Sequence, residues 1–403
     1  MPLLKEILIT GLAVLAGCGG SDAAPSSTAA GTGGSGASGG AAGDGPGGGS
    51  ATGGAGGAGA FGGTGGTTNG GPDAGADAVA PGAYYIAPDG LDTNPGTEAL
   101  PFKTLTRGHA VARAGTTLWI MAGTLDYGTT MVFSKSGTET DPIRVWAMPG
   151  TRPILDYASL PRGVSALRGI EVRGNYWHIK GLEIQNAADN GIAISGSHNI
   201  IEDVILHNNG DTGLQITANS AMATDNAYAA HNLVLNCDSY ENLDQETAGE
   251  NADGFAAKLR IGPGNVFRGC RAWNNADDGW DLFAADDVVV IDDCWAFLNG
   301  TTINGTNPAG DGNGFKLGGK PVGPGEGGAV HLVTHAAAFD NASCGFTRNN
   351  NLETPVLTDC AVHTNEKGDY CSLSCSPETM IATTGAEAKV LKRNEDGSLP
   401  AIH

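Results

Sequence analysis

The segment Arg271–Asn299 reads RAWNNADDGWDLFAADDVVVIDDCWAFLN and spans one full unit of an internal repeat. Its opening residues, RAWNN, align with its closing residues, WAFLN. Seven such segments align from about Gly169 onward, and each ends in an asparagine: Asn186, Asn209, Asn242, Asn275, Asn299, Asn341 and Asn365. The steps between these asparagines are 23, 33, 33, 24, 42 and 24 residues. A unit of about 23 or 24 residues, lengthened in three steps, is typical of one coil of a parallel β-helix.

The repeated asparagines predict a tight turn in each coil, because an Asn side chain bonds the backbone and tolerates left-handed geometry. Stacked on successive coils, their amides can bond each other along the axis. Five residues earlier, each repeat carries a small and mostly apolar residue that should point into the core: Gly181, Val204, Cys237, Cys270, Cys294, Ala336 and Cys360. The cysteines of this column are therefore expected to be core thiols.

A second repeated block follows each asparagine and predicts a strand. It contains a glycine, an apolar residue, a variable residue and usually another apolar residue. This alternation with a period of two places the middle residue on the outer face. The outward column predicted in this way contains Ala193, Gln215, Ala256, Asp281, Lys316 and Thr347. The ordered domain should begin near residue 83, with an N-terminal cap that includes a short helix within Thr104–Ala114.

Four carboxylates are predicted to converge on the outer face of two adjoining coils. Equivalent positions on neighbouring coils lie about 4.8 Å apart, which brings Asp253 beside Asp278 and Asp281 beside Lys316. Asp277 belongs to the same turn as Asp278. We expect an exposed patch that binds calcium, since Ca²⁺ takes 6–8 oxygen ligands and relieves the repulsion between carboxylates. The alternative is turn chemistry, because Asp before Gly is a common turn pair.

Lys316 is a candidate general base. It should point outward beside the four acids, and a nearby cation would favour its neutral form. The same cation could bind a uronate carboxylate and stabilise the charge that develops as the C5 proton leaves. The alternative is a surface ion pair between Lys316 and Asp281, which would contribute little to stability.

Three motifs resemble the signature blocks of the pectate lyases of polysaccharide lyase family 9. They are NADGFAAKL at Asn251–Leu259, NADDGWDL at Asn275–Leu282 and GDGNGFKLGG at Gly310–Gly319. The resemblance extends over about residues 84–400 and implies an all-β, right-handed parallel β-helix. It also implies a pectate lyase that cleaves uronan chains by calcium-assisted β-elimination. In that family four Asp hold the catalytic calcium and a Lys abstracts the C5 proton; by motif these are Asp253, Asp277, Asp278, Asp281 and Lys316.

The charge balance restricts the partners of the chain. With 43 acidic and 22 basic residues the formal charge is −21, and no basic run is available for nucleic acid. We expect a monomer that acts on an acidic polysaccharide, with Lys258 and Arg348 as further substrate-binding candidates. Two alternatives stay open: a β-helical glycoside hydrolase that uses Asp277 and Asp278, and a non-catalytic, calcium-containing surface module that binds glycans.

Residues 1–18 are typical of a lipoprotein signal peptide. Lys5 precedes an apolar run that is too short to span a bilayer, and Leu15-Ala16-Gly17-Cys18 matches a lipobox. The alternative is an ordinary signal peptide with an accidental Cys18. Residues 19–82 are rich in Gly, Ala and Ser and predict a disordered tether to the domain at residues 83–403. We therefore expect export and lipid anchoring at the outer membrane or cell surface, or secretion.

The cysteines beyond Cys18 number seven. An odd number in an exported protein predicts at least one free thiol or an intermolecular bond. The sequence leaves the pairing open among Cys344, Cys360, Cys371 and Cys375.

Overall fold

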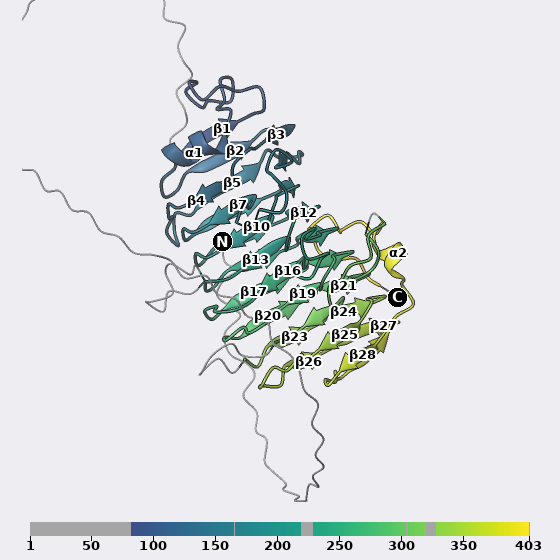
Figure 1. Cartoon of the computed structure of the whole chain (residues 1–403). Helices are drawn as coiled ribbons and strands as arrows, with labels where there is room; N and C mark the ends of the chain where they lie inside the picture. Colours follow the sequence, from purple (N-terminus) through teal and green to yellow (C-terminus); the bar gives the residue numbers. More distant parts are fainter. Residues whose placement is uncertain (1–81, 165, 219–228, 304, 320–327, 403) are drawn as a thin grey trace, which may run out of the picture. The chain divides into compact units, whose positions relative to one another are not determined.

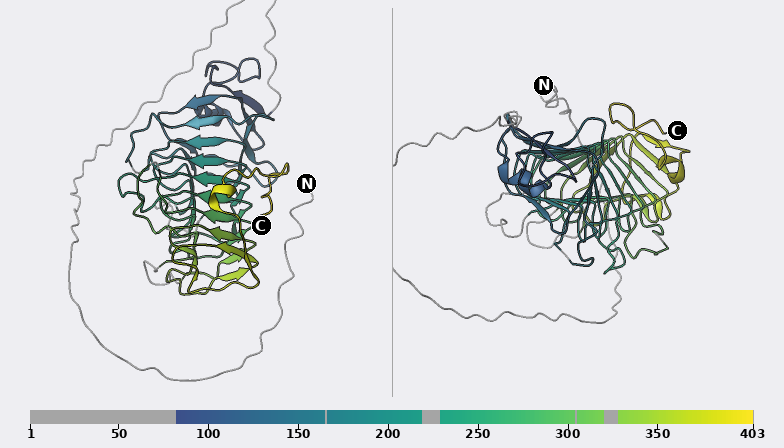
Figure 2. Two further views of the ribbon diagram at one scale, coloured as in Figure 1. Left: turned by 90° about the vertical axis from the view of Figure 1, so that its right-hand side faces the viewer. Right: turned by 90° about the horizontal axis from the view of Figure 1, so that it is seen from above.

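Short strands coil into three parallel sheets in the computed structural model, which describes residues 82–164, 166–218, 229–303, 305–319 and 328–402. We call the sheets A, B and C, and nearly every coil contributes one strand to each (Figure 1). The left view of Figure 2 shows the strands of successive coils lying one above another. The predicted right-handed parallel β-helix is confirmed. Residues 1–81, which include the predicted signal peptide, Cys18 and nearly all of the predicted tether, lie outside the described residues.

The strands follow one another in coil order within each sheet. Sheet A consists of β1 (Ala83–Ile86), β2 (Thr117–Ile120), β5 (Ile143–Ala147), β8 (Trp177–Lys180), β11 (Ile200–Glu202), β14 (Leu233–Leu235), β17 (Asn265–Arg268), β20 (Val289–Asp292), β23 (Leu332–Thr334) and β26 (Val356–Thr358). Sheet B consists of β3 (Thr124–Asp126), β6 (Ile154–Asp156), β9 (Glu183–Gln185), β12 (Ile205–His207), β15 (Asp238–Tyr240), β18 (Arg271–Trp273), β21 (Trp295–Phe297), β24 (Ala337–Phe339), β27 (Cys360–His363) and β29 (Glu378–Met380). Sheet C consists of β4 (Met131–Phe133), β7 (Ile170–Val172), β10 (Ile192–Ile194), β13 (Leu214–Ile216), β16 (Phe255–Ala257), β19 (Trp280–Asp281), β22 (Phe315–Lys316), β25 (Cys344–Thr347) and β28 (Gly368–Cys371).

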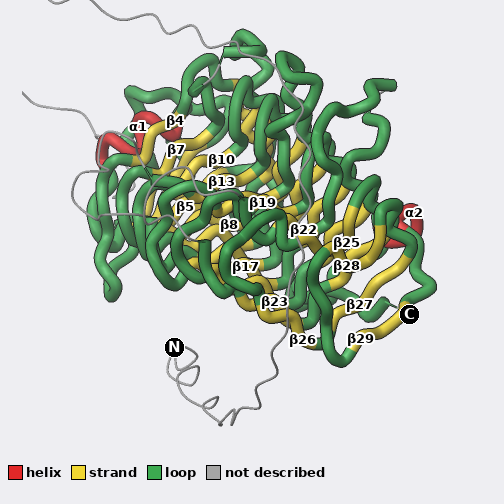
Figure 3. Tube along the Cα trace, turned by 60° about the horizontal axis from the view of Figure 1, so that its bottom comes forward, coloured by secondary structure: helices red, strands yellow, loops and turns green. Residues whose placement is uncertain are grey.

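The predicted N-terminal cap contains the helix α1 (Leu105–Val111). The side chain of Thr104 accepts a hydrogen bond from the backbone N–H of Arg107, as an N-cap residue does. Leu105 is buried in the main core, and Figure 3 shows α1 at the end of the coil stack where β4 lies. No helix among the described residues has the length and apolar character needed to cross a bilayer.

Aromatic rings stack inside sheet C and fix the position of its strands. Consecutive centroids of Phe255, Trp280, Phe315, Phe346 and Tyr370 are 5.0, 4.8, 4.9 and 5.5 Å apart. The first four side chains are fully buried. Because side chains alternate along a strand, the residue after each of these rings in β16, β19 and β22 points to the outer face.

The asparagine ladder is confirmed from Asn209 onward. Each amide Nδ2 donates to the Oδ1 of the next asparagine at 2.8–3.0 Å, through Asn242, Asn275, Asn299 and Asn341 to Asn365. The left-handed residue is the one before each ladder asparagine, such as Asn274 with a φ of 49°.

The predicted position of Asn186 was wrong by one residue. Because Glu183 pairs with Ile205, Ala187 lies beside Asn209 and Asn186 occupies the left-handed position. The inward residue of that coil is accordingly Leu182 rather than Gly181.

A second ladder, which the repeat alignment missed, precedes the strands of sheet A. The backbone N–H of Asn199 donates to Asn232 Oδ1, and that of Asn232 donates to Asn265 Oδ1. Two coils later His331 continues this ladder and accepts a hydrogen bond from the N–H of Val289.

Three of the column cysteines are the predicted core thiols. Cys237, Cys270 and Cys294 are free and buried. Cys360 was wrongly expected to be a thiol, because it forms a disulfide bond with Cys375. A second disulfide bond joins Cys344 to Cys371.

The C-terminal segment folds back over the outer face of sheet B. It includes α2 (Gly385–Ala388), and Ile381, Ala388 and Leu399 pack against the ring stack of Trp273, Phe297 and Phe339. The Arg393 guanidinium donates to the carbonyls of Cys237 and Gly269 and to Asp238. In both views of Figure 2 this yellow segment lies against the side of the coils.

Candidate active site

The predicted outward column is confirmed in register. Its members pair in order along sheet C: Ala193, Gln215, Ala256, Asp281, Lys316 and Thr347. Asp281 and Lys316 are therefore direct neighbours on adjoining strands β19 and β22. Asp277 and Asp278 precede Gly279, which leads into β19, and Asp253 precedes Gly254, which leads into β16.

The glycine after Asp278 is required by close packing of the backbone. A Cβ atom at Gly279 would lie 2.6 Å from the carbonyl oxygen of Gly314 and 2.9 Å from Asn299 Nδ2. Gly254 and Gly314 are crowded in the same way, by the next coil and its ladder asparagine. The repeated glycine thus allows the coils to stack closely where the acids emerge.

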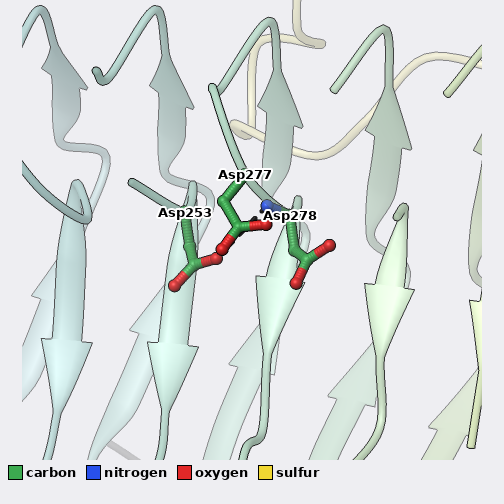
Figure 4. Close-up of side chains that lie close together, drawn as sticks. All are labelled: Asp253, Asp277 and Asp278. Carbon is green, nitrogen blue, oxygen red and sulfur yellow. Dashed lines mark hydrogen bonds between the residues drawn. The ribbon is translucent and has the colours of Figure 1, made fainter. Parts of the chain in front are cut away.

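Asp253, Asp277 and Asp278 form a compact cluster. Each offers one carboxylate oxygen, and these three oxygens all lie within 4.8 Å of one another. Figure 4 shows the three carboxylates gathered where adjoining strands begin, with Asp277 above the other two. The backbone N–H of Asp278 donates to Asp253 Oδ1 at 3.2 Å, which ties one coil to the next.

The expected exposed patch is wrong in one respect, since the acids point outward but are buried. Asp253 and Asp278 are 0% exposed, Asp277 3% and Asp281 4%. The reason is the loops between the coils. Ile303, in the insertion after Asn299, packs with Leu243 and Ala276, and the N–H of Asp311 donates to Asp277 Oδ1. These loops form walls beside the cluster.

Two lysines share the charge of this cluster. Lys316 Nζ lies 3.1 Å from Asp278 Oδ2 and 3.9 Å from Asp281 Oδ1. Lys258 Nζ lies 2.9 Å from Asp253 Oδ2 and 3.1 Å from Asp281 Oδ2. Asp281, the fourth predicted calcium ligand, is therefore joined to the cluster by both lysines, while the three-oxygen group consists of the other acids.

Burial and mutual repulsion change the protonation of the acids. Burial and the charges of Asp278 and Asp253 raise the pKa of Asp277 to about 10. Burial likewise raises the pKa of Asp278 to about 7, although Lys316 opposes the shift. Burial alone would lower the pKa of Lys316, but Asp278 and Asp281 raise it well above its usual value.

The donor set fits a divalent metal ion. When ionised, the four carboxylates outnumber the two ammonium groups, and Asp311 adds a fifth carboxylate 3.1 Å from Lys316 Nζ. A divalent ion would offset this excess charge in place of the protons that burial and repulsion keep on Asp277. Asp278 Oδ2 is buried and, among the described residues, accepts no hydrogen bond of good geometry. Hard carboxylate oxygens are the ligands that calcium prefers. Asp253, Asp277 and Asp278 would hold the ion, with Asp281 beside them.

Sequence reasoning missed several groups that orient the cluster. Asn313 donates to Asp278 Oδ1 through its backbone N–H at 2.7 Å and its side chain at 2.8 Å, and Thr212 Oγ1 donates to Asp253 Oδ2 at 3.1 Å. Both residues could have been found from the sequence, because each lies immediately before the glycine of the repeated block. Asp311, whose Oδ2 lies 3.1 Å from Lys316 Nζ, stands in the third quoted motif but three residues before the glycine that precedes β22, outside the aligned block.

Arg348 differs from the other candidates in its surroundings. Its guanidinium donates to the carbonyl oxygens of Asn351 and Leu352, within its own loop. Lys258, the other candidate for substrate binding, contacts the acids instead. A substrate-binding role for either residue stays a prediction.

Comparisons with known proteins agree with this arrangement. The family model described as "Pel9A-like, right handed beta helix region" matches residues 84–382. Pectate lyase L of Dickeya chrysanthemi is 40% identical over 278 residues, covering 66% of this chain and 62% of the relative. Pectate lyase PEL9 of Emericella nidulans is 34% identical over 315 residues, covering 70% of this chain and 73% of the relative. The chain thus spans about 62% of the length of the first of these relatives.

Solved structures show the same fold. The crystal structure of pectate lyase Pel9A superposes with a TM-score of 0.67 at 33% identity, covering 79% of this chain and 87% of that chain. A rhamnogalacturonan lyase superposes with a TM-score of 0.66 at 24% identity, a likeness of fold alone.

Proposed function

The chain belongs to the Pel9A-like right-handed β-helix family, the polysaccharide lyase family 9 group that its motifs resemble, and on that premise we propose that it is a calcium-dependent pectate lyase. The observation that carries the proposal is the position of Lys316. Its amine is the neighbour of Asp281 in the outward column and lies 3.1 Å from Asp278. A recessed amine beside a buried acidic cluster suits proton abstraction from a uronate.

The reaction proposed is β-elimination. Lys316 takes the proton from C5 of a uronate, the C4–O bond breaks, and the leaving oxygen departs with its electron pair, so that a C4=C5 double bond forms. The Lys316 side chain is only 10% exposed, which limits competition from water for the proton. Asn313 and Thr212 keep Asp278 and Asp253 in place, so the acids need not rearrange during the reaction.

Calcium is the proposed cofactor. When bound, it would offset the carboxylate charge that keeps Lys316 protonated and would bind the carboxylate of the substrate. Asp253, Asp277, Asp278 and Asp281 are the proposed ligands. Lys258, bonded to Asp253 and Asp281, holds these two carboxylates in fixed positions.

Export and lipid attachment at Cys18 are proposed from the sequence alone. The signal-like residues 1–18 and the Gly-rich residues that follow support them. The proposed partner is an acidic polysaccharide of the polygalacturonate type, bound by a monomer.

An ultraviolet assay tests the function directly. The purified chain is incubated with polygalacturonate, rhamnogalacturonan and alginate, each with calcium and with EGTA. We expect absorbance from the unsaturated product on polygalacturonate with calcium only. New reducing ends without absorbance would instead favour a glycoside hydrolase, and binding without turnover would favour a glycan-binding surface module.

A further inference from the structure

A pocket of about 250 Å³ opens on the outer face of sheet C, on the N-terminal side of the acidic cluster. Glu171, Ala193 and Gln215, from β7, β10 and β13, line it. These residues belong to the same outward column as Asp281 and Lys316. Three strand spacings separate Gln215 from Lys316, a distance of about 14 Å that several linked sugar rings span. The pocket and the proposed base therefore lie on one line along the coil axis.

The pocket and the acidic cluster are connected through the segment that follows β16. Leu259 lines the pocket, and its neighbour Lys258 bonds Asp253 and Asp281. Leu259 is 41% exposed. Its φ is +64°, which is costly for a bulky residue. An exposed apolar side chain held in this way gives the pocket a wall suited to the apolar face of a sugar ring.

Two arginines beside the pocket share one carboxylate. Arg173 Nη2 lies 2.7 Å from Glu171 Oε2, so Glu171 forms its shorter ion pair with Arg173. Arg168, which lines the pocket, makes only longer contacts: 3.3 Å to Glu171 Oε1, 3.3 Å to Asn190 Oδ1 and 3.5 Å to Asp189 Oδ2. The Arg168 side chain is 26% exposed, so its guanidinium is accessible to a ligand.

Ser195 supplies an independent sign of a missing partner. It lines the pocket, and its Oγ is buried without a hydrogen-bond partner among the described residues. Buried hydroxyls in proteins are nearly always hydrogen-bonded, to protein, water or ligand. A ligand rich in hydroxyl groups would satisfy Ser195 from inside the pocket.

We propose that this pocket is a remote binding subsite for one uronate residue of the substrate chain. Arg168 pairs with the carboxylate of that residue, while Gln215, Glu171 and Ser195 bond its hydroxyl groups. The polysaccharide then runs across the strands of sheet C, from the acidic cluster toward the N-terminal coils. The inference rests on the proposed lyase function and adds a preference for long chains.

Chain-length kinetics of Arg168→Gln test the subsite. For polygalacturonate we expect the KM to rise about tenfold, the loss of one charge-assisted bond, with kcat unchanged. For trigalacturonate, which is too short to bridge from Lys316 to the pocket, both constants should stay as in the wild type. Arg144→Gln is the matched control, because Arg144 lies on sheet A over the ring of Trp146. This control variant should leave the KM and the kcat for both substrates unchanged.

A second variant fills the pocket instead of removing a charge. Gln215→Trp should raise the KM for polygalacturonate and not for trigalacturonate, and thermal unfolding checks that both variants fold. The subsite would be overturned if a variant changed the KM for both substrates equally, or if neither variant changed the KM for polygalacturonate. Either result would leave the lyase function standing.

Calorimetry separates failure of the subsite from failure of the function. In EGTA, which removes the contribution of calcium, the wild type should bind hexagalacturonate more tightly than its methyl ester, and Arg168→Gln should lose this preference. Absence of turnover on polygalacturonate would overturn the lyase function, yet an Arg168-dependent preference for the acid form would still support a uronate-binding pocket. Equal binding of acid and ester by the wild type would overturn the role given to Arg168.

Discussion

Lys316 Nζ lies 3.1 Å from Asp278 Oδ2, although 38 residues separate the two positions in the sequence. The pairing of β19 with β22 produces this contact, because it places Lys316 beside Asp281 in the next coil. The proposed base and the proposed metal ligands are therefore held by the same backbone hydrogen bonds. A variant that alters the base should therefore also be tested for calcium binding, and a variant that alters the acids should be tested for turnover.

Replacing Lys316 by Ala should remove turnover without unfolding the chain. Loss of a general base lowers kcat by about a thousandfold, and we expect the product absorbance on polygalacturonate to fall by that order. Calcium binding, measured by calorimetry, should persist because the four acids remain. Lys367→Ala is the control, since Lys367 is exposed. Substantial residual activity in Lys316→Ala would remove this residue as the base.

Calcium should stabilise the folded chain, because it would offset the repulsion between the carboxylates of the cluster. At a free concentration one hundred times its Kd, a bound ligand adds about 2.7 kcal/mol, which calorimetric unfolding with calcium or EGTA detects. Magnesium at the same concentration controls for ionic strength.

The variant Asp277→Asn tests the origin of that stabilisation. Its amide oxygen can still accept the hydrogen bond from Asp311, and the amide replaces a carboxyl group that burial and repulsion keep protonated at neutral pH without metal. Without metal it should be at least as stable as the wild type at neutral pH, and calcium should stabilise it less. Asp126→Asn, at an exposed position of β3, is the control. An unchanged calcium effect in Asp277→Asn would contradict the ligand assignment.

His331 should make the fold sensitive to acid. Burial lowers the pKa of His331 to about 4, whereas an unfolded histidine titrates near 6.5. Between these values the unfolded chain binds the proton and the folded chain does not. Stability from this group is therefore present above pH 6.5 and falls by up to about 3 kcal/mol as the pH drops through 4.

Urea unfolding at several pH values, compared between the wild type and His331→Asn, isolates this effect. An asparagine can accept the bond from Val289, as the other members of that ladder do. The variant should lose less stability on acidification than the wild type. Identical pH slopes for the two proteins would exclude His331 as the source.

Arg393 should anchor the C-terminal segment to sheet B. Burial would raise the pKa of Asp238, but bonds with Arg271 and Arg393 hold it below its usual value. Arg393→Ala removes one of these partners and the hydrogen bonds to three carbonyl groups, so we expect a loss of about 2 kcal/mol in the free energy of unfolding. Denaturant titration measures it, with exposed Arg113→Ala as control. A loss no larger than that of the control would show that the segment is held by its apolar contacts.

The register of the site was predictable because a glycine followed by an apolar residue marks the start of each strand of sheet C from β7 to β22. That local pattern was enough to place Asp281 beside Lys316. The same reasoning failed at Asn186, because asparagine suits both the ladder position and the left-handed position before it. Adjacent polar residues in that turn, Gln185 and Asn186, gave no means of choosing between the two positions.

Burial of the acids was not predictable, since it depends on loops that are remote in sequence. Leu243 and Ile303 meet only after two coils have stacked. The role of Lys258 was also hidden, because its place after β16 says nothing of the direction in which its long side chain folds.

The longest step of the repeat, the 42 residues from Asn299 to Asn341, adds its extra length entirely between strands. Phe297 still faces Phe339 in the adjoining coil, as it would in a coil without the insertion. The loops beside the acidic cluster can therefore change in length while the stacked strands keep their register. New loops can be grafted to alter which polymers enter, while the spacing of the reactive groups is inherited from the backbone beneath.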